Sequence, residues 1–157
     1  MRRAIQVLPG TDRELSESAG TVTLNFEDRF RRRVLLKDDT GEEFMLDLAH
    51  ATRFEDGDGL ALEDGGVLLV RAAIEDVLRI TGRDRQHTAR LAWHIGNRHT
   101  PIEVLEDGTL QIQYDHVLQH MLKGLGGVVT RATAAFAPES GAYDDTSTGG
   151  HSHAHSH

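Results

Sequence analysis

The sequence has 157 residues, with 17 basic and 25 acidic residues, a net charge of −8 and no cysteine. This length allows one domain or two small ones, and the absence of cysteine excludes disulfides, thiolate metal sites, iron–sulfur clusters and cysteine nucleophiles. The acidic balance argues against nucleic acid as the main partner. No apolar run approaches the roughly 18 residues of a membrane helix, and no hydrophobic signal segment follows the N-terminal arginines, so we expect a cytoplasmic protein that does not bind membranes.

Residues 1–75 are predicted to form an all-β domain of about six strands. Apolar side chains alternate in residues 22–26 and 44–48, which is the spacing of half-buried strands. Clusters of acidic residues and glycine at 38–41 and 63–66 separate apolar segments. These clusters predict hairpin turns in which glycine supplies a positive φ.

Residues 76–143 are predicted to form a ferredoxin-like domain with the element order βαββαβ. The expected elements are a strand at 75–80, a helix at 85–97, a hairpin at 102–113, a second helix from 116 and a strand at 128–135. Asp84 and Asp115 are the expected N-caps of the two helices, and Asp107-Gly108 is the expected hairpin turn. The second helix carries one apolar stripe, at residues 117, 118, 121, 122 and 125. The fold class is therefore predicted to be α+β.

Residues 144–157 are predicted to be a disordered tail, because Gly, Ser, Thr, Asp and His leave too little apolar surface to offset the entropy of ordering. Near its end every second residue is a histidine, at His151, His153, His155 and His157. Neutral imidazole binds Ni²⁺, Zn²⁺ and Cu²⁺, so we expect this tail to bind metal for capture, storage or transfer, with little selectivity. The alternative is a purification tag or a solubilising low-complexity tail.

His116 follows the expected cap Asp115 and lies in the first turn of the second helix. The positive end of the helix dipole disfavours the imidazolium form, which leaves a neutral imidazole available as a ligand. One histidine cannot hold a metal alone, but a twofold dimer would bring a second copy beside it. His120 lies one turn further along and is predicted to share this side. The alternative is that both are solvent-facing or capping histidines.

The other polar residues predict no catalytic site. His87 and His94 are expected at surface or partly buried positions, and His99 is expected in a turn. The sequence contains no nucleophile elbow, no phosphate-binding glycine loop and no His-Glu-x-x-His motif, so we expect that the protein is not an enzyme. Arg29 and residues 31–33 form a basic cluster that we interpret as an exposed strand face, with a docking patch for an acidic partner as the alternative.

Three motifs precede the histidine-rich end: HIGNRHTPIEVL (94–105), YDHVLQHMLKGLG (114–126) and FAPESGAY (136–143). In this combination the chain closely resembles the UreE family of urease accessory nickel chaperones. The resemblance is strong over residues 75–157. It is moderate over the β half, where the segment RRRVLLKDDTGEEFMLDL (31–48) carries it.

The resemblance implies a β domain that binds peptides or proteins and a ferredoxin-like domain that dimerises. It implies that His116, in the Asp-His-Val-Leu motif, binds nickel at the interface of a homodimer, and that the tail histidines add a variable metal site. The implied function is to carry Ni²⁺ in the cytoplasm and to pass it, with an accessory GTPase, to apo-urease. Gln113 and Tyr114 stand where many relatives carry further histidines, so a richer interface site is not expected. The nitrogen and oxygen ligands do not exclude Zn²⁺ or Cu²⁺ binding in vitro.

Two other functions agree with the same residues. One is a nickel or zinc storage or detoxification protein of this fold, in which the tail is a metal reservoir. The other is a protein-interaction module whose metal binding is incidental. An RNA-binding ferredoxin-like domain is disfavoured, because the predicted strands lack the aromatic pattern that stacks bases and the charge is negative.

Overall fold

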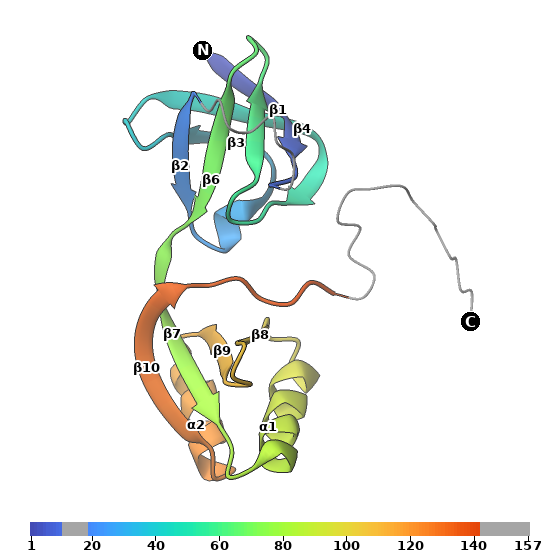
Figure 1. Ribbon diagram of the computed structural model, residues 1–157, viewed down its shortest axis with the longest axis vertical. Helices are drawn as coiled ribbons and strands as arrows, with labels where there is room; N and C mark the ends of the chain where they lie inside the picture. Colours follow the sequence, from blue (N-terminus) through green and yellow to red (C-terminus); the bar gives the residue numbers. More distant parts are fainter. Residues whose placement is uncertain (11–18, 142–157) are drawn as a thin grey trace, which may run out of the picture.

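The computed structural model describes residues 1–10 and 19–141. These residues form a six-stranded sheet and a four-stranded sheet that carries two α-helices (Figure 1). The predicted α+β class is therefore confirmed. No helix in the described part of the chain is long and apolar enough to cross a membrane. The predicted tail lies outside the described residues, and so do its four histidines, His151, His153, His155 and His157.

Six strands form the first sheet, as predicted. They are β1 (Arg2–Leu8), β2 (Gly20–Leu24), β3 (Phe30–Lys37), β4 (Glu43–Arg53), β5 (Gly59–Leu62) and β6 (Val67–Ala72). Their order in the sheet is β2-β6-β5-β1-β4-β3. The antiparallel pairs β3–β4 and β5–β6 confirm the two predicted hairpins, and their turn glycines Gly41 and Gly65 have φ values of +89° and +102°. The pairs β1–β4 and β2–β6 are parallel, a feature that strand periodicity does not predict.

One face of the first sheet encloses an apolar core. The alternation predicted along β4 is confirmed, because Phe44, Leu46 and Leu48 are buried while Met45 and Asp47 are partly exposed. Side chains from all the strands except β3 are buried in this core, and Val34 and Leu36 of β3 pack against it. The buried set is Ala4, Val22, Leu24, Phe44, Leu46, Leu48, Phe54, Leu60, Leu62, Leu68 and Val70.

Asp38 organises the turn between β3 and β4. Its Oδ1 accepts hydrogen bonds from the Thr40 hydroxyl and from the backbone N–H groups of Thr40 and Glu42, and its Oδ2 lies 2.7 Å from the Arg2 guanidinium. These donors, the Thr40 hydroxyl first and then Arg2, hold the pKa of the Asp38 carboxyl well below its usual range. The ionised carboxylate thus ties the start of β1 to this turn.

The second sheet and its helices have the predicted order βαββαβ. The strands are β7 (Ile74–Thr81), β8 (Glu103–Val104), β9 (Leu110–Gln113) and β10 (Val128–Ala135), in the sheet order β10-β7-β9-β8. The helices are α1 (Arg85–Asn97) and α2 (His116–Gly124). Both pack on one face of the sheet, where Leu91, Ile95, Leu118 and Leu122 share a core with Leu78, Ile80, Leu110 and Ile112.

Both predicted helix caps are confirmed. Asp84 precedes α1, and its side chain accepts a hydrogen bond of 2.8 Å from the backbone N–H of His87. Asp115 precedes α2, and its Oδ1 accepts from the N–H groups of Val117 and Leu118 at 2.9 and 3.0 Å. Each carboxylate satisfies helix donors that have no partner within the helix.

Residues 136–141, which follow β10, run between the two sheets (Figure 1). Phe136 is fully buried, and its ring meets the Phe26 ring edge-on at 5.5 Å between centroids. Arg29, in the 3-10 helix η2 (Glu27–Arg29), is only 3% exposed and donates to the carbonyl oxygens of Leu24 and Phe136. The prediction that Arg29 belongs to an exposed basic strand face is therefore wrong. Arg31, Arg32 and Arg33 are exposed, as expected.

Candidate metal centre

His116 is the first residue of α2, and its imidazole is exposed. Asp115 fixes the backbone here by capping the helix, and its carboxylate accepts hydrogen bonds from the N–H groups of Val117 and Leu118, not from the His116 ring. Within residues 1–10 and 19–141 the His116 ring makes no hydrogen bond. Both ring nitrogens of His116 are thus accessible to a metal ion.

His120 lies one turn beyond His116 and is also exposed. At 100° per residue, His116, Val117, His120 and Gly124 occupy the side of α2 opposite the buried Leu118 and Leu122. The structure therefore brings together the two predicted histidines of the folded domain on one open helix face.

The predicted apolar stripe of α2 is divided between the core and the surface. Leu118 and Leu122 are buried, whereas Val117 is 56% exposed beside His116, and Leu125 is also exposed. Val128, which begins β10, adds a further exposed apolar side chain. The reason is geometric: at 100° per residue Val117 points about 140° away from Leu122, so the sheet that covers Leu118 and Leu122 leaves Val117 at the surface. The sequence pattern did not distinguish the surface part of this stripe from the core part.

Tyr114 lies just before α2 and is also partly exposed. The Arg131 guanidinium stacks over its ring at 3.9 Å and forms a 3.3 Å ion pair with Asp76. This contact between β10 and the segment before α2 supports the backbone from which His116 projects. Cation–π contacts of exposed groups are weak, so the Arg131–Tyr114 contact mainly orients the Tyr114 ring.

No set of three or more His, Asp or Glu side chains in the described part of the chain is arranged to hold a metal ion. His116 and His120 together supply two nitrogen donors, fewer than the four or more ligands that Zn²⁺ or Ni²⁺ normally takes. A metal at this helix face therefore needs ligands from another source, such as a second protomer.

His87 is excluded as a ligand, and its predicted place at a surface or partly buried position is wrong. It is only 6% exposed. Its Nδ1 accepts a 2.9 Å hydrogen bond from the Arg83 N–H, so its Nε2 carries the proton and donates to the Leu125 carbonyl at 2.8 Å. Both ring nitrogens are used, and the ring joins the start of α1 to the end of α2.

The other two histidines near α1 lie where the sequence predicted them. His94 is partly buried, and its ring meets that of Trp93 edge-on at 5.0 Å. His99 lies in the turn after α1 with a φ of 59°. Neither is near His116 in a group that could hold a metal.

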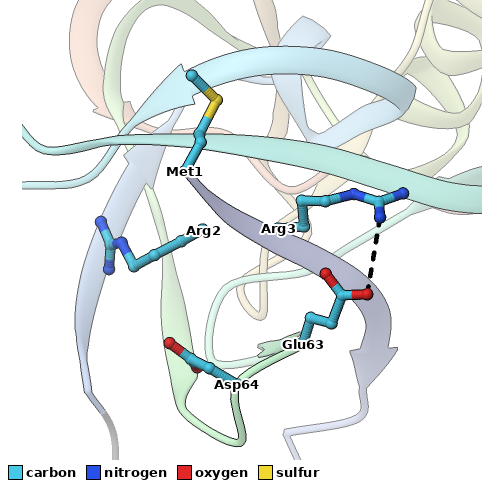
Figure 2. A pocket seen from close by; sticks show the side chains of 5 residues that line it. All are labelled: Met1, Arg2, Arg3, Glu63 and Asp64. Atoms are coloured by element: carbon cyan, nitrogen blue, oxygen red, sulfur yellow. Dashed lines mark ion pairs between the residues drawn. The ribbon is translucent and has the colours of Figure 1, made fainter.

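An open cavity of about 380 Å³ lies at the start of β1, and no histidine of the described residues lines it; its lining residues are Met1, Arg2, Arg3, Glu63 and Asp64. Figure 2 shows Arg3 and Glu63 pointing toward one another, and they form a 3.6 Å ion pair. Arg3 also pairs with Asp47, and Arg2 with Asp38. Because the arginines are neutralised by carboxylates, this cavity is not a candidate metal or catalytic site.

Comparison with protein families matches both halves of the chain. Residues 3–73 match the N-terminal domain, and residues 75–157 the C-terminal domain, of the UreE urease accessory protein. Urease accessory protein UreE of Chelativorans sp. (strain BNC1) is 48% identical over 157 residues, which cover 100% of this chain and 96% of the relative. The protein of that name from Bradyrhizobium sp. (strain ORS 278) is 46% identical over 99% of this chain and 70% of the relative. For the Rhodobacter capsulatus protein the identity is 46%, over 98% of this chain and 94% of the relative.

Proposed function

The chain belongs to the UreE family of urease accessory proteins, and we propose that it is a cytoplasmic nickel chaperone that delivers Ni²⁺ to apo-urease during assembly of the urease active site. The relatives are named as accessory proteins rather than as enzymes, which supports a role in maturation. The nickel ion is the cargo of this protein.

One observation carries the proposal: His116 is exposed, without a hydrogen bond in the described part of the chain, on an open face of α2 that also exposes Val117. An apolar side chain beside an available ligand favours contact with a second α2 helix around a twofold axis. Such a homodimer would bring two His116 rings together, with the two His120 rings one turn away. A nickel site shared between the protomers would thus be built from two incomplete halves.

A shared site suits delivery as well as binding. Imidazole nitrogens bind Ni²⁺ well, and they also accept Zn²⁺ and Cu²⁺, which we expect to bind in vitro. Ligands that come from two protomers can be replaced one at a time when an acceptor docks. The tail histidines, His151, His153, His155 and His157, would raise the local concentration of metal near this site as tethered ligands. We propose an accessory GTPase and apo-urease as the partners of the loaded dimer.

Urease activation at limiting nickel tests the proposal when it is combined with equilibrium dialysis. His116→Ala should lower activation sharply and remove the shared site, while the tail still takes up metal. Truncation after Gly150 should lower the number of bound ions and leave the shared site. His50→Ala is the matched control, because His50 is exposed in β4 of the other domain, and it should change neither measurement. If truncation abolishes activation and His116→Ala leaves it intact, the tail is the delivery device and the assignment of His116 is wrong.

A further inference from the structure

α1 carries a concentration of positive charge in an acidic protein. Residues 83–99 contain four arginines and one acidic residue, Asp84, whereas the whole chain has a net charge of −8. The Asp84 carboxylate accepts a hydrogen bond from the helix backbone and is outnumbered by the four arginines. The surface of α1 is therefore basic.

The arginines of this segment are not neutralised. Arg83, Arg85, Arg90 and Arg98 are all exposed, and none of them forms an ion pair with any residue in the described ranges. Elsewhere Arg2, Arg3 and Arg131 each pair with a carboxylate. An unpaired guanidinium at the surface offers its donors to an external acceptor, and carboxylates match its fork geometry.

A cleft of about 210 Å³ runs beside α1 toward the end of α2; its lining residues are Arg83, His87, Arg90, Leu91, His94 and Leu125. Among the described residues, no acidic side chain lines this cleft. Both nitrogens of His87 are already bonded, so the available donors are the two guanidinium groups and the His94 ring. Leu91 and Leu125 supply an apolar wall. These groups fit a carboxylate on a short aliphatic stem.

Trp93 extends the same surface. Its side chain is 62% exposed, and its ring contacts His94, which lines the cleft. Ala89 and Gly96, four residues before and three residues after it on the same helix side, leave the indole uncovered. Tryptophan and arginine are enriched among the residues that contribute most of the binding energy in protein interfaces.

We propose that α1 and the cleft beside it dock an acidic segment of a partner protein. In this interaction one carboxylate of the partner enters the cleft between Arg83 and Arg90, and an apolar side chain of the partner covers Trp93. The surface is separate from the α2 face that carries His116. A nucleic acid is the less favoured occupant, because a long polyanion would extend beyond α1 over the acidic remainder of the chain, whereas a short acidic segment stays within the basic surface.

Trp93 makes the proposal directly measurable, because it is the chain's only tryptophan. The probe is a twelve-residue peptide of glutamates around a central Leu-Phe pair, added to the full-length protein while tryptophan fluorescence is recorded. We expect a shift of the Trp93 emission and an affinity that falls as salt increases. The same peptide with lysine in place of glutamate should produce no shift.

The double variant Arg83→Gln/Arg90→Gln should bind the acidic peptide at least tenfold more weakly, whereas Arg32→Gln/Arg33→Gln, on the other sheet, should bind it as the wild type does. Circular dichroism checks that the variants are folded, and anisotropy of a labelled peptide gives a second measure of binding in wild type and Trp93→Ala. Equal affinity for the wild type and the Arg83/Arg90 variant would overturn the proposal. So would tighter binding of a single-stranded RNA twelve-mer than of the acidic peptide.

Discussion

The helices α1 and α2 lie on the same face of one sheet and begin in the same way, yet their first histidines have opposite roles. His87 turns inward and uses both ring nitrogens to join the two helices. His116 points outward and is bonded to nothing in the described part of the chain. Proximity to a helix start therefore does not decide whether a histidine can bind metal. The contacts of its ring decide it.

The exposed faces of the two helices also differ in chemistry. α1 presents arginines and Trp93, whereas α2 presents Val117 between two histidines. A charged face binds a partner of opposite charge, and an apolar face binds a similar apolar face. The two helices are thus suited to different partners.

The largest effect is expected from Val117→Asp, because a dimer through α2 would then bury two unpaired carboxylates. The dissociation constant of the dimer should rise at least a hundredfold, equivalent to about 3 kcal/mol or more. Val104→Asp is the matched control, since Val104 is similarly exposed on β8, and it should leave the dimer unchanged. Sedimentation velocity over a range of protein concentrations measures the dissociation constant of the dimer for each variant. Equal dissociation constants for both variants would remove α2 as the dimer contact.

His87→Ala should lower the free energy of unfolding by about 3 kcal/mol, because it leaves the Arg83 N–H and the Leu125 carbonyl without partners and opens a cavity. His116→Ala should change the same quantity by less than about 0.5 kcal/mol. Urea denaturation in metal-free buffer compares the two variants. The contrast between the helices is wrong if both variants have the same stability.

Nickel binding at the α2 face should weaken as the pH falls, because protons compete with Ni²⁺ for the imidazole nitrogens that bind it. Each imidazole ligand that must lose its proton should cost up to about tenfold in affinity per pH unit, or about 1.4 kcal/mol. Titration calorimetry at pH 7.5, 6.5 and 5.5 measures this slope in the protein truncated after Gly150. A constant affinity down to pH 5.5 would indicate carboxylate ligands instead of His116.

The smallest effects concern the two caps. Asp84→Ala removes one hydrogen bond to the backbone of α1, and Asp115→Ala removes two to that of α2. Each should lower the free energy of unfolding by about 1 kcal/mol. Asp115→Ala should additionally weaken nickel binding, because His116 is the next residue, while Asp84→Ala should not. Thermal melts and nickel titrations of both variants separate these effects, and identical nickel affinities would show that the cap does not position His116.

Much of the fold was predictable because the signals are local. Apolar alternation along β4, the Asp-Gly turn before β9 and the carboxylate caps at Asp84 and Asp115 all act over a few residues. The element order βαββαβ follows from them. The strand order of the first sheet, with its two parallel pairs, depends on contacts between distant segments, and no local pattern contains it.

The candidate site was predicted less completely, for the same physical reason. The burial of His87 depends on the carbonyl of Leu125, which lies 38 residues away. The burial of Arg29 depends on Phe136, which lies 107 residues away. The arginines around β3 are adjacent in the sequence and form an evident cluster, whereas those of α1 are spaced along a helix and form no local pattern. His116 is exposed because it lies on the side of α2 that faces away from the sheet. Which side of α2 the sheet covers is not visible in the local sequence.

The contact of Arg29 between the two sheets has a consequence for which substitutions the protein tolerates during evolution. Its guanidinium binds backbone carbonyl oxygens of Leu24 and Phe136 and none of their side-chain atoms. Every amino acid supplies such a carbonyl, so a substitution at Leu24 would change the apolar core and leave this acceptor in place. The attachment between the two sheets can therefore persist through substitutions at its acceptor positions, while Arg29 itself has no equivalent replacement.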